Sequence, residues 1–302
     1  MMTSNRRRRF RRGASEDAMP FQLQDRDRDI LQLAFDYRLL TSRHIELLIP
    51  GSNQNLLRRL QKLFKHHYLD RIQVPNHQAM VYGLGNQGAD TLAEMGLIER
   101  KRIDWSAKNR HLADHFIAHT LMISDVRCLI TVALRDVPEI TMHSWVGEGG
   151  LRHDVLIEGS QKRKIVAHII PDGSFILEKP RPGGGKPLQL HLFLEADRGT
   201  EAGSSKFREK MQAYWTFWRE EDYEQTYHRT SFEVLVVCPG EKRRDNLRRI
   251  THDVSDNPQD AGLAMFRFAS ATEYTLDDPS TILKPIWLTA RKGDDTLHSL
   301  LE

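Results

Sequence analysis

Residues 52–84, SNQNLLRRLQKLFKHHYLDRIQVPNHQAMVYGL, carry two different hydrophobic periods one after the other. Apolar side chains recur at helical spacing in the first half, and two β-rich runs flank Pro75-Asn76 in the second. The pattern predicts an amphipathic helix followed by a β-hairpin. The apolar face of that helix is expected to hold Leu56, Leu57, Leu60, Leu63 and Phe64.

Two shorter helices are predicted upstream. One begins at Asp25, and the other has Thr41 as its N-cap and stops at Pro50-Gly51. Three short helices followed by a hairpin are the element order of a winged helix-turn-helix. Residues 21–100 are therefore predicted to form a DNA-binding domain of this kind.

The outer face of the helix at 53–66 is strongly basic. Six bases face two acids over residues 41–71, which gives a local net charge of +4. In a winged helix-turn-helix this is the helix that enters the major groove, so a solvated surface is the weaker alternative. The predicted DNA contacts are Arg43, Arg58, Arg59, Lys62 and Lys65.

Charge outside this helix is concentrated at the start of the chain. The net charge is +3, and removing the six arginines of residues 1–12 leaves −3 for the remainder. Residues 1–20 are therefore expected to be a disordered basic arm, which either is a solvated tail or binds phosphates.

The chain of 302 residues, 39% of them apolar, is long enough for about two domains. No run reaches the ~18 apolar residues of a membrane helix, and no signal peptide is recognised, which favours a cytoplasmic protein without membrane contact. The two cysteines, Cys128 and Cys238, lie in apolar runs and are expected to be reduced core residues. The polar segment 101–111 is predicted to be a linker.

Residues 112–302 are expected to form the second domain. A long helix is followed by short strand-like runs, a helix at 204–221 rich in aromatic residues, and a buried strand at 232–238. This order, α-β-β-β-α-β, predicts an α/β domain with a mixed central sheet, and the whole chain is assigned to the α+β class. The residues of the strand-like runs are 140–146, 155–157, 164–170, 174–177 and 190–195.

Carboxylates stand at the ends of two of these apolar strands. Asp172 ends one strand, and Glu195 and Asp197 end another about twenty residues later. If the strands are adjacent, Asp172 and Glu195 lie close together and form a hard-oxygen site suited to Mg²⁺ or Mn²⁺. Acids where a sheet meets solvent are the alternative interpretation.

Two other motifs favour structural roles. The glycines of GLGNQG at 83–88 match a dinucleotide motif, but no crossover to a second parallel strand follows, so no nucleotide cofactor is expected. His111, His115 and His119 are spaced for zinc, although the glutamate expected after the first histidine of such a site is missing. Surface or core histidines are favoured there.

The Pro171-Asp172 and Glu195-x-Asp197 motifs, in this element order, resemble the PD-(D/E)XK nuclease superfamily. The third motif position departs from that pattern, because Asp197 stands where a lysine is usual. More narrowly, the chain is similar to the replication-relaxation family of plasmids and other mobile elements. The matching stretches are RDRDILQLAFDYRLLTSRHIELL at 26–48, VYGLGNQGADTL at 81–92, HTLMISDVR at 119–127, PDGSF at 171–175, FLEADRGTE at 193–201 and KMQAYW at 210–215.

The resemblance implies a winged helix joined to a nuclease-like domain that processes plasmid DNA. Asp172, Glu195 and Asp197 would then hold one Mg²⁺ or Mn²⁺, and a lysine displaced to the next helix would stabilise the phosphate. Lys210 is the candidate because it lies in the K-x-x-x-Y match, with Arg198 as a substitute that also contacts DNA.

Two functions stay open. One is a metal-dependent endonuclease that nicks or cleaves DNA, and the other is a non-catalytic winged-helix regulator or initiator accessory with a degenerate nuclease fold. Double-stranded DNA is the expected partner in both cases. A homodimer and a relaxase or ATPase partner are left open.

Overall fold

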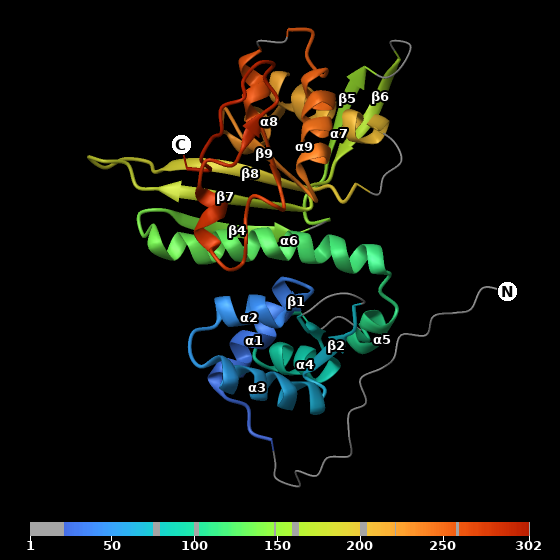
Figure 1. Cartoon of the computed structure of the whole chain (residues 1–302), viewed down its shortest axis with the longest axis vertical. Helices are drawn as coiled ribbons and strands as arrows, with labels where there is room; N and C mark the ends of the chain where they lie inside the picture. Colours follow the sequence, from blue (N-terminus) through green and yellow to red (C-terminus); the bar gives the residue numbers. More distant parts are fainter. Residues whose placement is uncertain are drawn as a thin grey trace, which may run out of the picture. The chain divides into compact units, whose positions relative to one another are not determined.

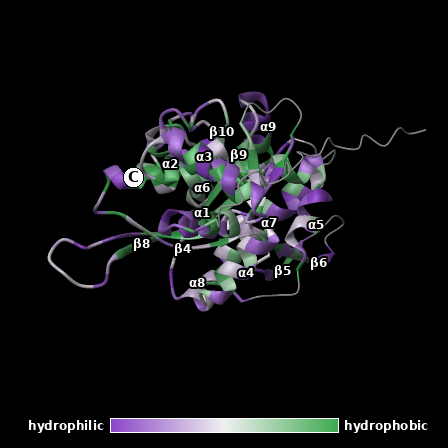
Figure 2. Cartoon of the chain, turned by 90° about the horizontal axis from the view of Figure 1, so that it is seen from below, coloured by the Kyte–Doolittle hydropathy of each residue, from purple (hydrophilic) through white to green (hydrophobic). Residues whose placement is uncertain are grey.

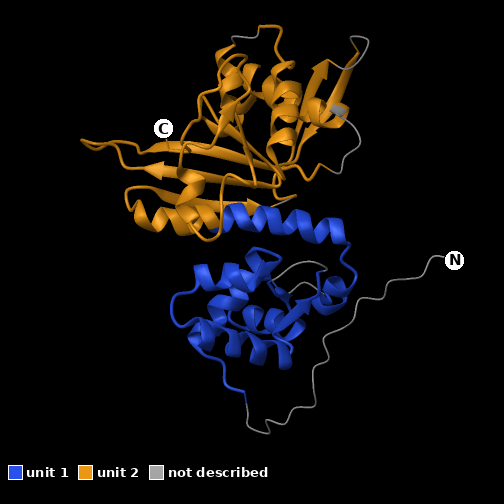
Figure 3. Cartoon of the chain, in the orientation of Figure 1, with its two compact units in different colours: residues 1–128 blue, residues 129–302 orange. Residues whose placement is uncertain are grey.

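The structure is a computed structural model, and it describes residues 21–74, 79–99, 103–147, 149–158, 163–199, 204–220, 222–257 and 260–301. The chain divides into two compact units, residues 1–128 and 129–302 (Figure 3). Helices and strands occur in both units, so the protein is of the predicted α+β class. The arm predicted at 1–20 and the turn predicted at Pro75-Asn76 lie outside the described residues.

The first unit contains the three predicted helices and the two strands of the predicted hairpin (Figure 1). A strand that the sequence analysis did not predict, β1, completes an antiparallel sheet in the order β1-β3-β2. The elements are α1 (Asp25–Asp36), β1 (Leu40–Thr41), α2 (Ser42–Leu48), α3 (Asn53–Lys65), β2 (Leu69–Ile72), β3 (Val81–Leu84), α4 (Asn86–Glu94), α5 (Trp105–Arg110) and the first part of α6 (Asp114–Ala133).

Thr41 is the N-cap of α2, as predicted. Its hydroxyl accepts a hydrogen bond from the backbone N–H of His44, and its own N–H donates to His44 Nδ1 at 3.1 Å. Because Nδ1 accepts, the other ring nitrogen carries the proton, and Nε2 donates to Asp125 Oδ1 at 2.6 Å. The fully buried His44 therefore ties the start of α2 to α6.

Part of the predicted linker at 101–111 is a helix. Asp104 caps α5 by accepting from the Ala107 N–H, and Trp105 packs edge-on against Phe35. Asn109 is buried, where its amide donates to the Leu84 carbonyl and to Asp70. The prediction missed α5 because only a few side chains of this polar segment face inward.

The unit boundary also differs from the prediction, since it lies inside α6 rather than before residue 112. Ile117 and Leu121 belong to the core of the first unit together with Leu39, Ile72 and Val81. Residues 114–136 are also apolar enough to span a membrane by length and composition, contrary to the sequence expectation. More than half of the most apolar 18-residue stretch in that segment is buried in the protein, as in a core helix of a soluble protein.

The second unit has a mixed six-stranded sheet in the order β11-β10-β9-β8-β7-β4 (Figure 1). Strands β8, β9 and β10 are parallel to one another, and the other pairs are antiparallel. A separate antiparallel pair is formed by β5 (His153–Glu158) and β6 (Lys164–Ile169). The remaining elements are η1 (Leu134–Asp136), β4 (Thr141–Gly147), β7 (Gly173–Lys179), β8 (Leu188–Ala196), α7 (Ser204–Arg219), α8 (Asp222–Tyr227), β9 (Glu233–Cys238), α9 (Glu241–His252), η3 (Ala261–Met265), β10 (Phe266–Ser270), η4 (Pro279–Leu283) and β11 (Leu288–Thr289).

Aromatic side chains of α7 fill the core of this unit. Phe207, Met211, Tyr214 and Trp215 are buried against Phe193 and the apolar strands β9 and β10. The hydrophobic colour of these two strands in Figure 2 agrees with their cover on both faces.

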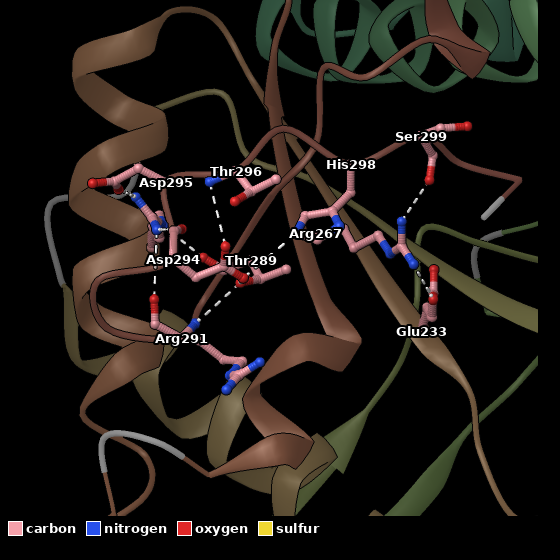
Figure 4. A network of polar contacts seen from close by, with 10 residues as sticks. Glu233, Arg267, Thr289, Arg291, Asp294, Asp295, Thr296, His298 and Ser299 are labelled. Carbon is pink, nitrogen blue, oxygen red and sulfur yellow. Dashed lines mark hydrogen bonds and ion pairs between the residues drawn. The ribbon is translucent and has the colours of Figure 1, made fainter.

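The C-terminal segment is tied to the same sheet by a buried arginine (Figure 4). Arg267 on β10 donates to Glu233 Oε1 on β9 at 2.7 Å and to the Ser299 carbonyl at 2.6 Å. The pKa of Glu233 is raised above its usual value, because burial outweighs the opposing effect of the nearby Arg267 guanidinium. The pair therefore fixes residues near 299 to the sheet through groups that are shielded from water.

Candidate functional site

Asp172 lies at the start of a strand, whereas the sequence analysis predicted it at the end of one. The preceding strand β6 ends at Ile169, and Asp172 stands just before β7, which pairs with β8 in antiparallel register. The start of β7 therefore meets the end of β8, with Gly173 opposite Leu194. The Asp172 N–H donates to the Leu194 carbonyl at 3.0 Å, and its Oδ2 accepts from the Ala196 N–H at 2.7 Å.

Gly173 leaves room for the Trp145 ring against the start of β7. A methyl group at that position would overlap the Trp145 ring, which stacks on Phe175 with the ring centres 5.1 Å apart. Asp172 is consequently held in place by its hydrogen bonds to the main chain of Leu194 and Ala196, and the Trp145 ring packs against the neighbouring Gly173.

Glu195 is buried, with 4% of its surface exposed, and both of its oxygens accept hydrogen bonds from α7. Lys210 Nζ lies 2.6 Å from Oε2, and the Tyr214 hydroxyl lies 2.7 Å from Oε1. Lys210 and Tyr214 are four residues apart, so one face of the helix supplies both donors. Lys210 therefore points from α7 back toward Glu195, while its predicted role in stabilising a phosphate stays a prediction.

Burial and charge pairing have opposite effects on the pKa of Glu195. Burial raises the pKa of Glu195 to about 7, the Lys210 ammonium opposes that shift, and the Asp172 carboxylate adds to it. The same burial, together with the Glu195 charge, raises the pKa of Tyr214 well above its usual value. Glu195 can therefore change protonation near neutral pH, whereas Tyr214 remains a hydrogen-bond donor.

Asp197 is not brought into this cluster. Its two carboxylate oxygens accept from Arg243 Nε and Nη2 on α9, each at 2.8 Å, in a bidentate pair. The sequence analysis missed Arg243 because α9 contains several arginines and nothing in the spacing distinguishes this one. It missed Tyr214 as well, although Tyr214 is the tyrosine of the K-x-x-x-Y match.

Over the described ranges, no three His, Cys, Asp or Glu side chains gather as a metal site. Asp172 and Glu195 still offer hard carboxylate oxygens, and an oxygen that accepts one hydrogen bond keeps a second lone pair. Asp172 and Glu195 as ligands of Mg²⁺ or Mn²⁺ therefore stay a prediction, in which each Glu195 oxygen would use the lone pair that Lys210 or Tyr214 leaves open. Asp197 as a third ligand remains a prediction that requires its pair with Arg243 to open.

A second buried polar chain lies farther along the same strands. Ser174 Oγ is 2.7 Å from His191 Nε2, and the Tyr223 hydroxyl is 3.0 Å from Nδ1. Burial lowers the pKa of His191 to about 4, and the charges of Arg229 and His153 add to the shift. The imidazole is therefore neutral at neutral pH and links β7, β8 and α8.

The outer face of α3 agrees with its predicted basic character at three positions. Arg58, Lys62 and Lys65 are exposed. Leu57 was assigned to the apolar face, but 44% of its surface is exposed, because Leu56, Leu60, Leu63 and Phe64 complete the buried stripe without it. The exposed stripe is Gln54, Leu57, Arg58, Gln61, Lys62 and Lys65.

Arg59 differs from its neighbours. Its guanidinium forms a bidentate pair with the fully buried Asp27, donates to the Gln22 carbonyl and lies over the Phe21 ring. The sequence analysis counted it among the DNA contacts, whereas its donors are directed into the first unit. Arg43, also a predicted contact, is 3.6 Å from Glu46. Arg198, the predicted DNA contact beside Asp197, is half-buried.

The glycine motif at 83–88 has the structural role that the sequence analysis favoured. Methyl groups at Gly85 and Gly88 would overlap the carbonyl oxygens of His67 and Tyr68. The Gly85 N–H donates to the Tyr68 carbonyl at 2.9 Å, and the Gln87 N–H donates to the His67 carbonyl at 3.2 Å. Backbone donors at the start of α4 are thus used within the protein.

The comparisons with known proteins give one family and no individual relative. A search of curated proteins and a search of solved structures find no match. The profile described as replication-relaxation matches residues 31–234, which is about two thirds of the chain. That stretch covers α3, Asp172, Glu195 and Lys210. The chain therefore belongs to the replication-relaxation family.

Proposed function

We propose that this protein binds double-stranded DNA in the replication or relaxation of a plasmid or mobile element, and that it nicks or cleaves that DNA with a divalent metal. The family supports the biological setting. The single observation that carries the nuclease part is Lys210, whose Nζ lies 2.6 Å from Glu195 beside Asp172. A cation thus stands next to the carboxylates although position 197 has no lysine.

DNA binding is assigned to the first unit as a winged helix-turn-helix with α3 as its recognition helix. The supporting features are the element order, the antiparallel β1-β3-β2 sheet and the stripe of exposed bases and glutamines on α3. Arg58, Lys62 and Lys65 neutralise phosphates, while Gln54 and Gln61 are of the type that reads base edges in the major groove.

The nuclease site is assigned the PD-(D/E)XK arrangement with Asp172, Glu195 and Lys210. Asp172 and Glu195 would hold Mg²⁺ or Mn²⁺, which supplies activation of a water and neutralisation of phosphate charge. Lys210 and Tyr214 orient the Glu195 carboxylate from α7. When Lys210 moves from Glu195 toward a bound phosphate, it offsets the charge that develops on the phosphate oxygens.

The test is conversion of supercoiled plasmid to open circles by the full chain with Mn²⁺, Mg²⁺ or EDTA. We expect nicking with either metal, none with EDTA, and none from Asp172→Asn or Lys210→Met with DNA binding retained. Asparagine keeps an oxygen that can accept from the Ala196 N–H, so the Asp172 variant removes the charge without removing the bond. Nicking by Asp172→Asn would refute the assigned site.

The DNA-binding assignment has its own test. Replacing Arg58, Lys62 and Lys65 with alanine should make the log–log dependence of DNA affinity on salt shallower by roughly 2–3 units, because each lost phosphate contact accounts for about 0.9. Fluorescence anisotropy on a labelled duplex measures this slope. An unchanged slope and affinity would show that α3 does not contact DNA.

A second candidate is a non-catalytic DNA-binding protein with a degenerate nuclease fold. The observation that favours it is Asp197, which is bound by both oxygens to Arg243 rather than to the Asp172–Glu195 cluster. In that case isothermal titration calorimetry would detect no Mn²⁺ binding and the plasmid would stay supercoiled, while the salt-dependent binding to DNA persisted.

A further inference from the structure

The β7–β8 arm, residues 179–189, is a surface that neither the recognition helix nor the carboxylate site explains. All eleven residues are exposed, from Lys179 to Gln189. The hairpin extends past the other strands in Figure 1, and its tip has the purple and white colours of hydrophilic residues in Figure 2.

The arm is basic along its whole length. Lys179, Arg181 and Lys186 lie in it, and its sequence contains no aspartate or glutamate. Residues 13–302 have a net charge of −3 even with these three cations included, so the arm is a basic segment in an otherwise acidic part of the chain. Such a segment attracts a polyanion.

The shape of the arm also suits a nucleic-acid backbone. Gly183, Gly184 and Gly185 have φ angles of +86°, +87° and +102°, and nothing lies within 4 Å of the position that a methyl group on each would occupy. The tip therefore presents main chain without side chains, which lets it approach a phosphate closely. A two-stranded ribbon fits the ~12 Å width of the major groove.

The direction of the arm is fixed at its base. The ladder between β7 and β8 continues to the pair Lys179 and Leu188. Just inside it, Gln189 donates to Glu178 Oε2 at 2.5 Å and accepts from Arg229 Nη2 at 2.6 Å. A ribbon whose base is held in this way loses less conformational freedom on binding than a disordered loop.

We propose that the β7–β8 arm is a second DNA-binding element, which contacts the phosphates and groove of duplex DNA through Lys179, Arg181, Lys186 and its glycine tip. The inference rests on the proposed function, because it takes the partner to be DNA. At about 3.4 Å per residue, six residues of β7 separate Lys179 from Gly173 by about 20 Å. The base of the arm, at Lys179, therefore lies about six base pairs along a duplex from a phosphodiester at Asp172, and the glycine tip lies farther out.

The first test compares three forms of the full chain on one labelled duplex: wild type, an arm variant and a charge-matched control. The arm variant is Lys179→Ala/Arg181→Ala/Lys186→Ala. The control, Arg163→Ala/Lys164→Ala/Arg219→Ala, removes the same charge from exposed positions of the same unit. We expect the arm variant alone to lose roughly ten- to hundredfold in affinity at 0.1 M salt, with a salt slope shallower by about 2–3 units. Its melting temperature should equal that of wild type.

A second test does not depend on affinity. Both native cysteines are buried, so a Pro182→Cys variant can be labelled at the arm tip alone with a tethered iron–EDTA cleavage reagent. We expect DNA strand breaks confined to a few neighbouring base pairs, and none when the label is placed at Arg219→Cys. Breaks spread evenly over the duplex would overturn the inference.

The outcomes separate the arm from the function on which it rests. Wild-type affinity and slope in the arm variant, with loss of binding in the Arg58/Lys62/Lys65 variant, would overturn the arm and keep the DNA-binding function. An arm that serves an acidic protein partner would give that same result. If wild type binds no duplex, both the proposed function and the arm inference fail.

Discussion

Two adjacent arginines on α3 show how differently one residue type is used. Arg58 is exposed, whereas Arg59 forms a bidentate pair with Asp27, which is completely buried. Removal of Arg59 leaves an unpaired carboxylate in the interior. We expect Arg59→Ala to lower the free energy of unfolding by about 3–5 kcal/mol, because breaking a buried pair exposes the full desolvation cost of the remaining charge.

Urea denaturation followed by circular dichroism measures this difference, and Arg58→Ala is the matched control. The control should change stability by less than about 0.5 kcal/mol, since its side chain is solvated. Equal effects of the two substitutions would contradict the structural role of Arg59.

The burial of His191 predicts that the free energy of unfolding depends on pH. Its pKa is lowered from 6.5 to about 4 in the folded protein, chiefly by burial and further by Arg229 and His153. The unfolded chain therefore takes up a proton before the folded one does, so the stability that the neutral ring contributes is complete above pH 6.5 and is lost as the pH falls toward 4. The loss should be on the order of 3 kcal/mol.

The measurement is the unfolding free energy of wild type and His191→Gln at several pH values between 4 and 7. Glutamine can still donate to and accept from Ser174 and Tyr223 but does not titrate in this range. The difference between the two proteins should therefore change with pH over this interval. A constant difference would show that the folded and unfolded chains protonate His191 alike.

At the carboxylate site, sequence reasoning reached the strand acids and Lys210 but not their partners. Apolar strands that end in acidic residues can be recognised in a sequence, and so can a lysine in the helix that follows them. The pairing of Asp197 with Arg243 depends on where α9 lies against the sheet, which local spacing does not encode. Likewise, nothing local distinguishes Arg58 from Arg59, because Asp27 is thirty-two residues away.

Among the elements, those with a strong period were predictable and those held by tertiary contacts were not. The three helices of the first unit, the hairpin strands and the buried strand at 233–238 follow from 3.6- and 2-residue patterns. The two-residue strand β1 exists only because β3 lies beside it, and α5 is held by Trp105 and Asn109. The position of Asp172 was predicted at the end of a strand, but the ladder places it at the start of the next one.

The turn from β3 into α4 supplies a prediction at the element scale. Gly85 lies so close to the His67 carbonyl that a methyl group there would overlap it. Gly85→Ala should therefore destabilise the protein by about 1–3 kcal/mol, because either the strand β3 or the chain around His67 has to shift. The comparison is Gly147→Ala on β4, where the corresponding position is open and the change should stay within about 0.5 kcal/mol.

Thermal melts of the two alanine variants beside wild type provide the measurement. Similar melting temperatures for Gly85→Ala and wild type would mean that the glycine motif has no packing role, and its resemblance to a nucleotide-binding motif would then need another explanation.

For the whole chain, the unit boundary inside α6 predicts where the protein can be divided. Ile117 and Leu121 complete the core of the first unit, and Asp125 binds His44. A fragment of residues 21–128 should fold cooperatively. A fragment of residues 21–111 lacks these groups and should lose several kcal/mol, at about 1.5–3 kcal/mol for each buried aliphatic side chain, which is comparable to the whole stability of a small domain.

Dispersion of the amide signals in two-dimensional NMR spectra distinguishes a folded fragment from a collapsed one. A well-dispersed spectrum of 21–111 would restore the domain boundary expected from the polar segment at 101–111.

Each unit contains one buried thiol, and the labelling rate of that thiol can be measured separately. Cys128 belongs to the first unit and Cys238 to the second, and the chain has no other cysteine. A thiol reagent can modify each sulfur only during transient opening of the structure around it, so the two labelling rates report two opening equilibria under native conditions. Binding of duplex DNA should slow the labelling of the thiol in any unit that the DNA stabilises. Mass spectrometry of the two labelled peptides would show whether that is the first unit, the second or both.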